Sequence, residues 1–503
     1  MTTADWHVHR PQLYSATQVR ELDRRAIEDG GIPGYTLMRR AAQAAFDALR
    51  AHWPHARAVA VLCGPGNNGG DGYELARIAC AAGLQVQVAS VGGLPKRGDA
   101  VHALAAWVDA GGEVSGFDET FVRGPMAQAD VQVDAIFGIG IDREVGGVAL
   151  AAIEAINARA SAQAALAIDL PSGLDADTGA VHGTAVRADV TVSFIGRKLG
   201  VYTGAGPDHA GLREFADLGV DPGLLQQAPG VAELMQLEEL APALPRRARD
   251  THKGRHGHVL IVGGDLGMAG AVLLAARGAL RAGAGLVSVA TRAAHALPLT
   301  AAQPEAMFHG IERADDLAPL LPRADVVAIG PGLGTREWGR TLLEVCLPAA
   351  AARVIDADAL NLLAQDGCWP LPTGTVITPH PGEAGRLLGR RTGEVQAQRL
   401  QAACDLHALT GAVVVLKGAG SLVVDGHRRL LCPLGNPGMG AGGTGDVLTG
   451  VIAALIAQGL APAAAAAVGV LGHARAGDVA AAAGERGLLP GDLIAQLRAV
   501  LNP

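Results

Sequence analysis

The amino-acid sequence predicts an α/β protein with two domains, each built on a largely parallel sheet. Short apolar runs recur along the chain, and each is followed by a glycine-rich or polar segment and then by a helical pattern. The 503 residues are enough for two or three domains with large cores. With 49% hydrophobic and 18% charged residues, the composition indicates a globular chain and excludes a disordered one.

The first half shows a strand, a glycine-rich loop and a helix in succession. Two helices are expected within residues 12–50, divided by a glycine- and proline-containing break at residues 30–34. The glycine-rich segment, residues 64–72, follows the first strand, and a helix is expected from Tyr73. The expected strands lie at residues 58–63, 85–90, 131–137 and 165–170. This order predicts a Rossmann-like, doubly wound sheet that binds its ligand where the strands end.

Polar residues gather at those strand ends. Asn67, Asn68 and Asp71 add side-chain oxygens that a simple phosphate cradle does not need. They suit a cation, or ribose and amide contacts, and Asx-turns would explain one of them but not three. Asp134 and Asp169 lie in or near buried strands, where a charge is costly unless it is bound. We therefore expect one crevice that collects all these residues.

The pattern loosens between residues 219 and 250, where prolines and a short basic cluster occur. Such segments are typical of domain boundaries. The sequence therefore predicts a first domain at residues 1–225, a linker at 226–249 and a second domain at 250–503.

The second half repeats the alternation of strand and helix. A strand near residues 258–263 precedes a helix at 268–280. Further strands are expected to end within the segments 326–334, 353–361, 376–383 and 412–420. His380 stands between two prolines and is either a turn histidine or a ligand contact. Lys417 ends an apolar run, where it could meet a phosphate or simply solvent.

Residues 436–446 form a glycine-rich turn that opens the apolar helical pattern that follows them. Such a turn leaves backbone N–H groups aimed outward, with the positive end of the helix dipole behind them, and phosphate is the usual occupant. Asp446 is an ordinary helix cap on one interpretation. We favour another, in which it accepts a proton from a hydroxyl group that attacks a phosphoryl group.

Charge and cysteine usage narrow the setting of the protein. The net charge of −8 argues against a nucleic-acid partner. The six cysteines show no CxxC spacing, which predicts neither a disulfide framework nor a metal cluster and favours the cytoplasm. The longest apolar run, residues 451–471, is interrupted by Gln458, Gly459 and Pro462, so two packed helices explain it better than a membrane span.

Taken together, these motifs resemble those of the bifunctional NAD(P)H-hydrate repair enzymes, in which an epimerase domain is fused to an ADP-dependent dehydratase domain. The resemblance spans nearly the whole chain. It rests on an ordered set of segments, namely residues 64–73, 134–140, 168–174, 252–254, 267–271, 330–334, 356–361, 378–383, 417–421 and 436–446.

For the first domain, the resemblance implies interconversion of the R and S forms of hydrated NADH and NADPH. Asp169 is the expected acid/base. The positions that match potassium ligands are Asn68, Asp134 and Ser172. The positions that match substrate contacts are Asn67, Asn68, Gly69, Gly70, Asp71, Gly138, Ile139, Gly140, Ile141, Asp142, Arg143, Glu144 and Asp169.

For the second domain, the resemblance implies a ribokinase-like fold, magnesium carried with ADP, and Asp446 as the catalytic base. The hydrate would bind at Ala271, Gly334, His380 and Asp446. The nucleotide would bind at Lys417, Gly418, Ala419, Gly420, Ser421 and Gly445.

Two other functions fit parts of the sequence. A small-metabolite kinase with ATP as donor would use Asp446 equally well, but it has no evident use for the first domain. A nucleotide sensor without catalysis would not need Asp169, His380 and Asp446 together. The apolar helices of both halves further suggest a homo-oligomer. The partners implied by the resemblance are small molecules, namely the hydrates and ADP.

Overall fold

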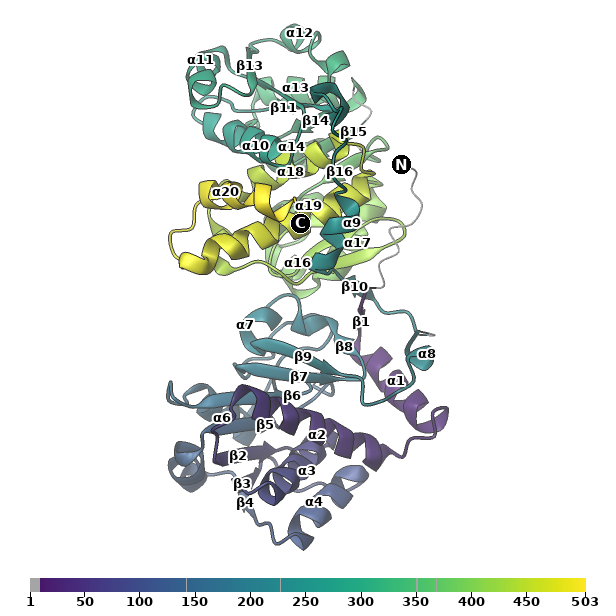
Figure 1. Ribbon diagram of the computed structural model, residues 1–503, viewed down its shortest axis with the longest axis vertical. Coiled ribbons are helices and arrows are strands. Elements are labelled where there is room, and N and C mark those ends of the chain that lie inside the picture. Colours follow the sequence, from purple (N-terminus) through teal and green to yellow (C-terminus); the bar gives the residue numbers. More distant parts are fainter. Residues whose placement is uncertain (1–9, 142, 227, 350–351, 368) are drawn as a thin grey trace. The chain divides into compact units, whose positions relative to one another are not determined.

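The computed structural model describes residues 10–141, 143–226, 228–349, 352–367 and 369–503 (Figure 1). The contacts divide the chain into two compact units at residues 232 and 233. The N-terminal unit is Pro11–Ala232, and Arg10 belongs with the C-terminal unit, Glu233–Pro503. The predicted two-domain α/β architecture is confirmed.

The N-terminal unit contains a seven-stranded parallel sheet in the order β4-β3-β2-β5-β6-β7-β9, and β1 pairs with β8. Its strands are β1 (Gln12–Tyr14), β2 (Ala58–Cys63), β3 (Gln85–Ser90), β4 (Val114–Gly116), β5 (Val131–Ala135), β6 (Ala164–Ile168), β7 (Val190–Phe194), β8 (Arg197–Lys198) and β9 (Leu212–Ala216). Its helices are α1 (Ala16–Glu28), α2 (Gly34–His52), α3 (Asn67–Ala81), α4 (Asp99–Asp109), α5 (Glu119–Phe121), η1 (Val122–Met126), α6 (Gly147–Asn157), η2 (Leu199–Val201), α7 (Gly206–Ala210) and α8 (Pro222–Gln226).

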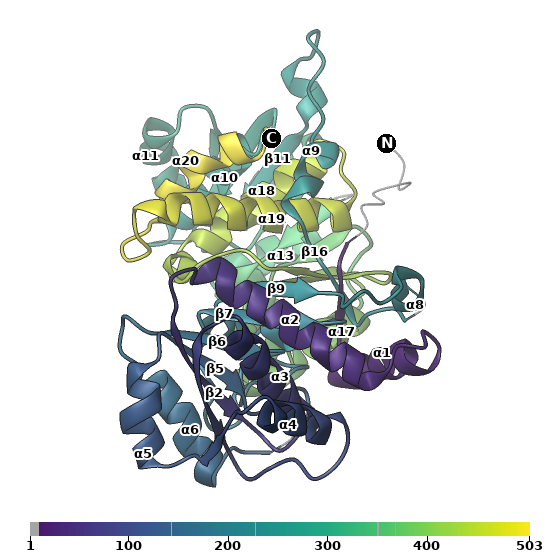
Figure 2. The same ribbon diagram turned by 60° about the horizontal axis from the view of Figure 1, so that its bottom comes forward.

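Both faces of this sheet are covered, as the apolar strands predict. Alternate strand residues such as Val61 and Val133 pack against α1, α2, α3 and α4. Their neighbours on the other face, Leu62 and Ala165 among them, pack against α5, η1 and α6. Figure 2 shows α1 and α2 on one side of the strands and α5 and α6 on the other. The predicted doubly wound arrangement is therefore present.

The C-terminal unit contains a mixed sheet in the order β13-β12-β11-β14-β15-β16-β17-β18-β19-β10, parallel from β13 to β17. Its strands are β10 (Ala232–Leu234), β11 (His258–Val262), β12 (Leu286–Thr291), β13 (Met307–Gly310), β14 (Val326–Ile329), β15 (Ala352–Ile355), β16 (Thr375–Ile377), β17 (Val413–Leu416), β18 (Ser421–Val424) and β19 (Arg429–Cys432). Its helices are η3 (Leu237–Glu239), α9 (Leu240–Ala243), η4 (Lys253–His256), α10 (Ala269–Arg281), α11 (Ala293–Ala302), α12 (Ala314–Leu317), η5 (Leu321–Arg323), α13 (Glu337–Ala349), α14 (Ala357–Asp366), α15 (Pro381–Leu388), α16 (Thr392–Ala397), α17 (Arg399–Thr410), η6 (Pro437–Gly440), α18 (Thr444–Ala457), α19 (Pro462–Ala480), η7 (Ala481–Ala483) and α20 (Pro490–Val500).

The predicted linker, residues 226–249, is not an open connection. It contains β10, which pairs with β19, and the short helices η3 and α9. Glu239 in this segment is buried and receives two hydrogen bonds, both of 2.9 Å, from Arg10. Local sequence could not reveal this structure, because the arginine that fixes Glu239 lies more than two hundred residues away.

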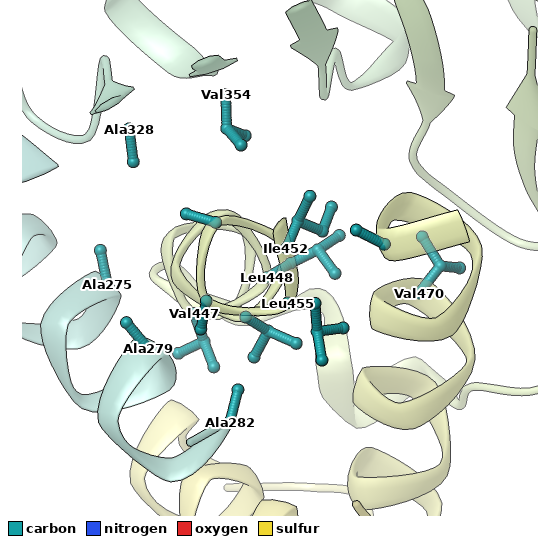
Figure 3. Packing of buried hydrophobic residues seen from close by; sticks show 14 of the residues in the cluster. Ala275, Ala279, Ala282, Ala328, Val354, Val447, Leu448, Ile452, Leu455 and Val470 are labelled. Carbon is teal, nitrogen blue, oxygen red and sulfur yellow. The ribbon is translucent and has the colours of Figure 1, made fainter. Parts of the chain in front are cut away.

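Helix α18 is the centre of the C-terminal core. Figure 3 shows it between α10 and α19, with Ala328 of β14 and Val354 of β15 on its remaining side. The backbones of α10 and α18 approach so closely that a Cβ atom at Gly450 would lie 1.9 Å from the carbonyl oxygen of Ala275. As predicted, the apolar run at residues 451–471 forms two helices, α18 and α19. No helix in the described parts of the chain is long and apolar enough to cross a membrane.

The contact at Gly450 predicts a loss of stability on substitution. The free energy of unfolding of a Gly450→Ala variant should be lower than that of the parent by about 2 kcal/mol, because α10 and α18 must separate to admit the methyl group. Urea denaturation followed by circular dichroism measures this. Gly491→Ala is the matched control, since no atom lies within 4 Å of the added Cβ in α20. Equal losses in both variants would contradict the packing argument.

Candidate active sites

The candidate site of the N-terminal unit lies at the point where the strand order reverses. Strands β2 and β5 are neighbours there, and the chain winds outward from them in opposite directions. Ligands of doubly wound sheets bind outside the carboxyl ends of the strands at such a point. The residues that follow β2, β5 and β6 therefore come together at one end of the sheet, as the sequence predicts.

Helix α3 begins at Asn67 and not after Gly72, so the predicted loop is wrong over residues 67–72. The glycines serve close packing here. A Cβ atom at Gly69 would lie 1.9 Å from the carbonyl oxygen of Gly64, and one at Gly72 would lie 2.6 Å from the Cβ of Ala135. The first turns of α3 are thereby held directly against the ends of β2 and β5.

Asp134, near the end of β5, is fully buried and fixed by Ser172. Ser172 donates from its backbone N to Oδ2 at 2.7 Å and from Oγ to Oδ1 at 2.6 Å. Burial raises the pKa of Asp134 to about 6, against the opposing effect of these hydrogen bonds. The two residues present a rigid group of oxygen atoms.

Asn68 is the clearest sign of a ligand in this crevice. Its side chain is buried, with 8% of the residue exposed, and neither amide atom has a hydrogen-bond partner in the described parts of the chain. A buried amide without a partner is costly. A Cβ atom at Gly138 would lie 3.6 Å from Asn68 Cγ and 3.5 Å from Asp169 Oδ2, so Asn68 and Asp169 border the same space.

Asp169 follows β6 with a φ of +70°, a conformation that is uncommon outside glycine and is found at functional sites. Its backbone is held on both sides: its N donates to Val192 O at 2.8 Å, and its O accepts from Ser193 Oγ at 2.7 Å. The side-chain atom Oδ1 forms an ion pair with Lys198. The carboxylate is therefore closely oriented.

Two charged residues of this site, Asp23 of α1 and Lys198 of β8, were not predicted from the sequence. Burial raises the pKa of Asp23 to about 6, while Lys198 lowers it and Asp169 raises it further. Burial, followed by Asp169 and Asp23, raises the pKa of Asp71 well above its ordinary range, and Lys198 opposes this rise. No local signal marks Asp23, which lies among other charged residues of an amphipathic helix.

The remaining predicted contacts lie in the segment after β5. Arg20 of α1 donates to the carbonyl oxygen of Ile139 at 2.8 Å, and Glu144 borders Gly183. Asn67 is exposed at the start of α3. Gly138, Gly140, Ile141 and Arg143 belong to the same segment, and Asp142 lies outside the described residues.

The candidate site of the C-terminal unit lies beyond the carboxyl ends of β15, β16 and β17, which are neighbours in the sheet. Lys417, directly after β17, donates from Nζ to Asp356 Oδ1 at 2.7 Å. Its Nζ also lies 4.0 Å from Glu383 Oε2. Asp356 is only 1% exposed and also accepts from Thr449 Oγ1 at 2.7 Å. Lys417 is thus an organised member of a charged cluster and not a solvated strand end.

Asp446 lies in the first turn of α18, after the N-cap Gly443, whose φ is +96°. A Cβ atom at Gly445 would lie 3.2 Å from Lys417 Nζ, so this turn adjoins the cluster. Burial and the charge of Asp356 raise the pKa of Asp446 to about 7, and Lys417 opposes them. A carboxyl group that titrates near neutral pH is suited to act as a general base.

The pKa of Lys417 reflects the same cluster. Burial lowers it, but Asp356 and Glu383 more than offset this and raise it above its ordinary value. Burial also raises the pKa of Glu383 to about 7. The cluster therefore combines one cation with several carboxyl groups.

His380 caps helix α15. Its Nδ1 accepts from Gly382 N at 2.9 Å, which places the ring proton on Nε2, 3.2 Å from Glu383 Oε1. Burial, aided by Lys417, lowers the pKa of His380 and favours this neutral form. Both ring nitrogens are engaged, so the half-exposed ring offers its face and edge to a ligand.

Gly334 and Ala271 lie on two neighbouring segments, the loop after β14 and the first turn of α10. Gly334 has a φ of +72°, and its N donates to Asp358 Oδ2 at 2.9 Å. A Cβ atom at Gly332 would lie 3.1 Å from that of Ala271, in the first turn of α10. The loop after β14 thus runs close to the start of α10.

Arg399 holds the predicted nucleotide loop, residues 417–421, in place. It was not predicted from the sequence. It is 2% exposed, and its Nη2 donates to the carbonyl oxygens of Lys417 and Gly420, each at 3.3 Å. Ser421 closes the loop, because its Oγ donates to Gly418 O at 3.0 Å. Gly445 faces this loop, while Ala419 lies within it.

A largely parallel sheet with a glycine-rich helix N-terminus that carries an acid beside a lysine is typical of nucleotide-binding α/β domains that transfer phosphoryl groups. Solved structures support a ribokinase-like fold for the C-terminal half. The C-terminal half is similar to a ribokinase-like superfamily protein from Enterococcus faecalis V583, at 30% identity and a TM-score of 0.51, covering 54% of this chain and 98% of that one. A hypothetical protein from Streptococcus mutans matches 53% and 98% of the two chains, at 29% identity and a TM-score of 0.50.

Family profiles and relatives then cover both halves. Residues 259–498 match the NAD(P)H-hydrate dehydratase family, and residues 34–200 match the family of YjeF-related protein N-termini. The bifunctional NAD(P)H-hydrate repair enzyme of Coxiella burnetii is 46% identical over 98% of this chain and 99% of its own length. The bifunctional NAD(P)H-hydrate repair enzyme of Escherichia coli K12 is 42% identical over 98% of this chain and 94% of its own length. The chain belongs to the family of bifunctional NAD(P)H-hydrate repair enzymes, as its motifs predict.

The raised pKa of Asp446 has a consequence for stability. An unfolded aspartate titrates near pH 3.9, so folding disfavours ionised Asp446, and this penalty grows from about pH 4 until it is complete above about pH 7. An Asp446→Asn variant should therefore be more stable than the parent at pH 8, on the order of 2 kcal/mol. At pH 5 its gain in stability over the parent should be smaller. Urea denaturation at both pH values measures this.

The exposed Asp315 provides the control for this comparison. An Asp315→Asn variant should change stability little, and by the same amount at pH 5 and pH 8. If Asp446→Asn gave the same difference at both pH values, the environment assigned to Asp446 would be wrong.

Proposed function

We propose that this chain repairs hydrated NAD(P)H in two steps. The N-terminal unit interconverts the R and S hydrates, and the C-terminal unit dehydrates the S form at the expense of ADP, giving NAD(P)H, AMP and phosphate. Family membership supports both steps. The observation that carries the second step is Asp446, whose pKa is about 7, in the first turn of α18 and beside Lys417.

In the dehydratase step, Asp446 accepts the proton of the hydroxyl group on the nicotinamide ring. The oxygen of that group attacks the β-phosphorus of ADP, and AMP leaves. Backbone N–H groups at the start of α18 stabilise the charge on the transferring phosphoryl group. The ring carbon–oxygen bond then breaks, phosphate departs, and loss of a proton from the adjacent ring carbon restores NAD(P)H.

The two substrates occupy opposite sides of Asp446 in this proposal. The nucleotide binds at Lys417, Gly418, Ala419, Gly420, Ser421 and Gly445, on the loop that Arg399 holds. The hydrate binds at Ala271, Gly334, His380 and Asp446. His380 supports the ring through its face, since its nitrogens are engaged within α15.

Magnesium is expected to accompany ADP. Asp356, Asp358 and Glu383 place negative charge near Lys417 and Asp446, and the nucleotide adds more. Within the described residues, no group of three or more His, Cys, Asp or Glu side chains could hold a metal by itself. These carboxyl groups therefore fit an ion that the phosphates carry with them, and such an ion neutralises phosphate charge when bound.

In the epimerase step, the ring hydroxyl group leaves as water, and water returns to the other face of the ring. Asp169 transfers the protons, because its carboxylate is oriented and borders the space beside Gly138. The contacts are made by Asn67, Asn68, Gly69, Gly70, Asp71, Gly138, Ile139, Gly140, Ile141, Asp142, Arg143, Glu144 and Asp169.

Potassium completes this site in our proposal, held by Asn68, Asp134 and Ser172. The unpartnered amide of Asn68 and the fixed oxygens of Asp134 and Ser172 suit a hard cation. When bound, such an ion supplies positive charge beside the substrate. We further propose that the chain works in the cytoplasm as a homo-oligomer on small molecules, without nucleic-acid or membrane partners.

Single substitutions should separate the two activities. With mixed NADHX, ADP, magnesium and potassium, the parent chain should restore absorbance at 340 nm completely. Asp446→Asn should reduce this recovery at least about a thousandfold, because the general base is lost, yet still equilibrate the R and S forms. Asp169→Asn should recover the S form quickly and then stall. A parent chain that restores no absorbance with ADP would sink the proposal.

The cation site gives an independent prediction. Asn68→Ala should raise the potassium concentration needed for half-maximal epimerisation at least about tenfold, because one oxygen ligand is removed. The rate of R-to-S conversion, followed chromatographically without ADP, measures this. Dehydration of the pure S form is the internal control and should not change. Epimerisation that is indifferent to potassium in the parent chain would remove the ion from the site.

A further inference from the structure

Lys198 is a buried cation in the N-terminal unit to which no role has been given above. It is 1% exposed and lies on the two-residue strand β8, opposite Tyr14 of β1. Its Nζ donates to Phe194 O at 3.0 Å and forms an ion pair with Asp169 Oδ1. A buried lysine keeps its charge only where such partners compensate for the loss of water.

The ion pair leaves the two oxygens of Asp169 in different environments. Oδ1 is bound by Lys198 and lies 3.4 Å from Phe194 N. Oδ2 faces the space beside Gly138, which Asn68 also borders. Since Lys198 is enclosed, it cannot itself reach a substrate there, and its influence must pass through Asp169.

We propose that Lys198 is a positioning residue of the epimerase site, which holds Oδ1 of Asp169 and thereby presents Oδ2 of that carboxylate to the hydroxyl group of the hydrate. This inference rests on the proposed epimerase function. The carboxylate would otherwise rotate freely about its terminal bond. An oriented acceptor keeps the reacting atoms in line, which accounts for much of the efficiency of proton transfer.

Lys198 has a second, electrostatic effect on the same site. Three carboxyl groups face it from three elements: Asp23 of α1, Asp71 of α3 and Asp169 after β6. Its positive charge lowers the pKa of Asp23 and of Asp71, against burial and mutual repulsion. Without it, the cluster would hold more protons at a given pH, and a base in it would become effective only at higher pH.

The test is a Lys198→Met variant of the full chain, assayed for conversion of the R hydrate to the S hydrate in potassium buffer without ADP. We expect kcat to fall about 10- to 100-fold, with KM changed less than about threefold, because the substrate contacts remain. The acidic limb of the pH–rate profile should move to higher pH. Lys198→Arg, which keeps the charge, should recover part of the rate.

Arg197→Met is the matched control, since it removes a neighbouring cation whose guanidinium lies 3.8 Å over the ring of Phe215, and it should leave kcat and the pH profile unchanged. If Lys198→Met fails to fold, Lys198→Gln replaces it, because glutamine can still donate to Phe194 O. A folded variant with the parent's kcat and pH profile would overturn the assignment alone. A parent chain that does not interconvert the hydrates would overturn the epimerase function and the assignment with it.

Discussion

Both sites depend on a helix whose glycines let it pack unusually closely against its neighbours. In the N-terminal unit, Gly69 and Gly72 let α3 contact the backbone after β2 and the end of β5. In the C-terminal unit, Gly278 and Gly450 bring the backbones of α10 and α18 together. A side chain at any of these positions would push the helix, and with it Asn68 or Asp446, away from the crevice where its partners lie.

The two sites also share an electrostatic arrangement, although their chemistry differs. Each surrounds one lysine with several carboxyl groups. Lys198 faces Asp23, Asp71 and Asp169, while Lys417 faces Asp356, Glu383 and Asp446. One carboxylate pairs with the lysine directly, and burial raises the pKa of others. Such sites can hold an ionised and a protonated acid side by side near neutral pH.

The sequence revealed those parts of the sites that adjoin glycine-rich segments. Asn68 and Asp446 stood out in the sequence because polar residues interrupt runs of glycine there. The start of α3 was predicted wrongly. Glycine usually favours loops, but here the glycines lie within the helix because close packing leaves no room for a side chain. Asp23, Lys198 and Arg399 could not be predicted, since each lies in an ordinary helix or short strand and gains its role from partners on distant elements. The local pattern carries no record of those partners.

The choice of partner for Lys417 bears directly on the base that we propose, Asp446. Lys417 donates to Asp356 at 2.7 Å, and Thr449 holds the other oxygen of that carboxylate. Had the lysine paired with Asp446 instead, it would have stabilised the ionised form and lowered the basicity of the carboxylate. Asp356 holds the ammonium group of Lys417, and the pKa of Asp446 remains at about 7. In the same way, Lys198 pairs with only one oxygen of Asp169, and in our proposal the other oxygen stays available to the hydrate.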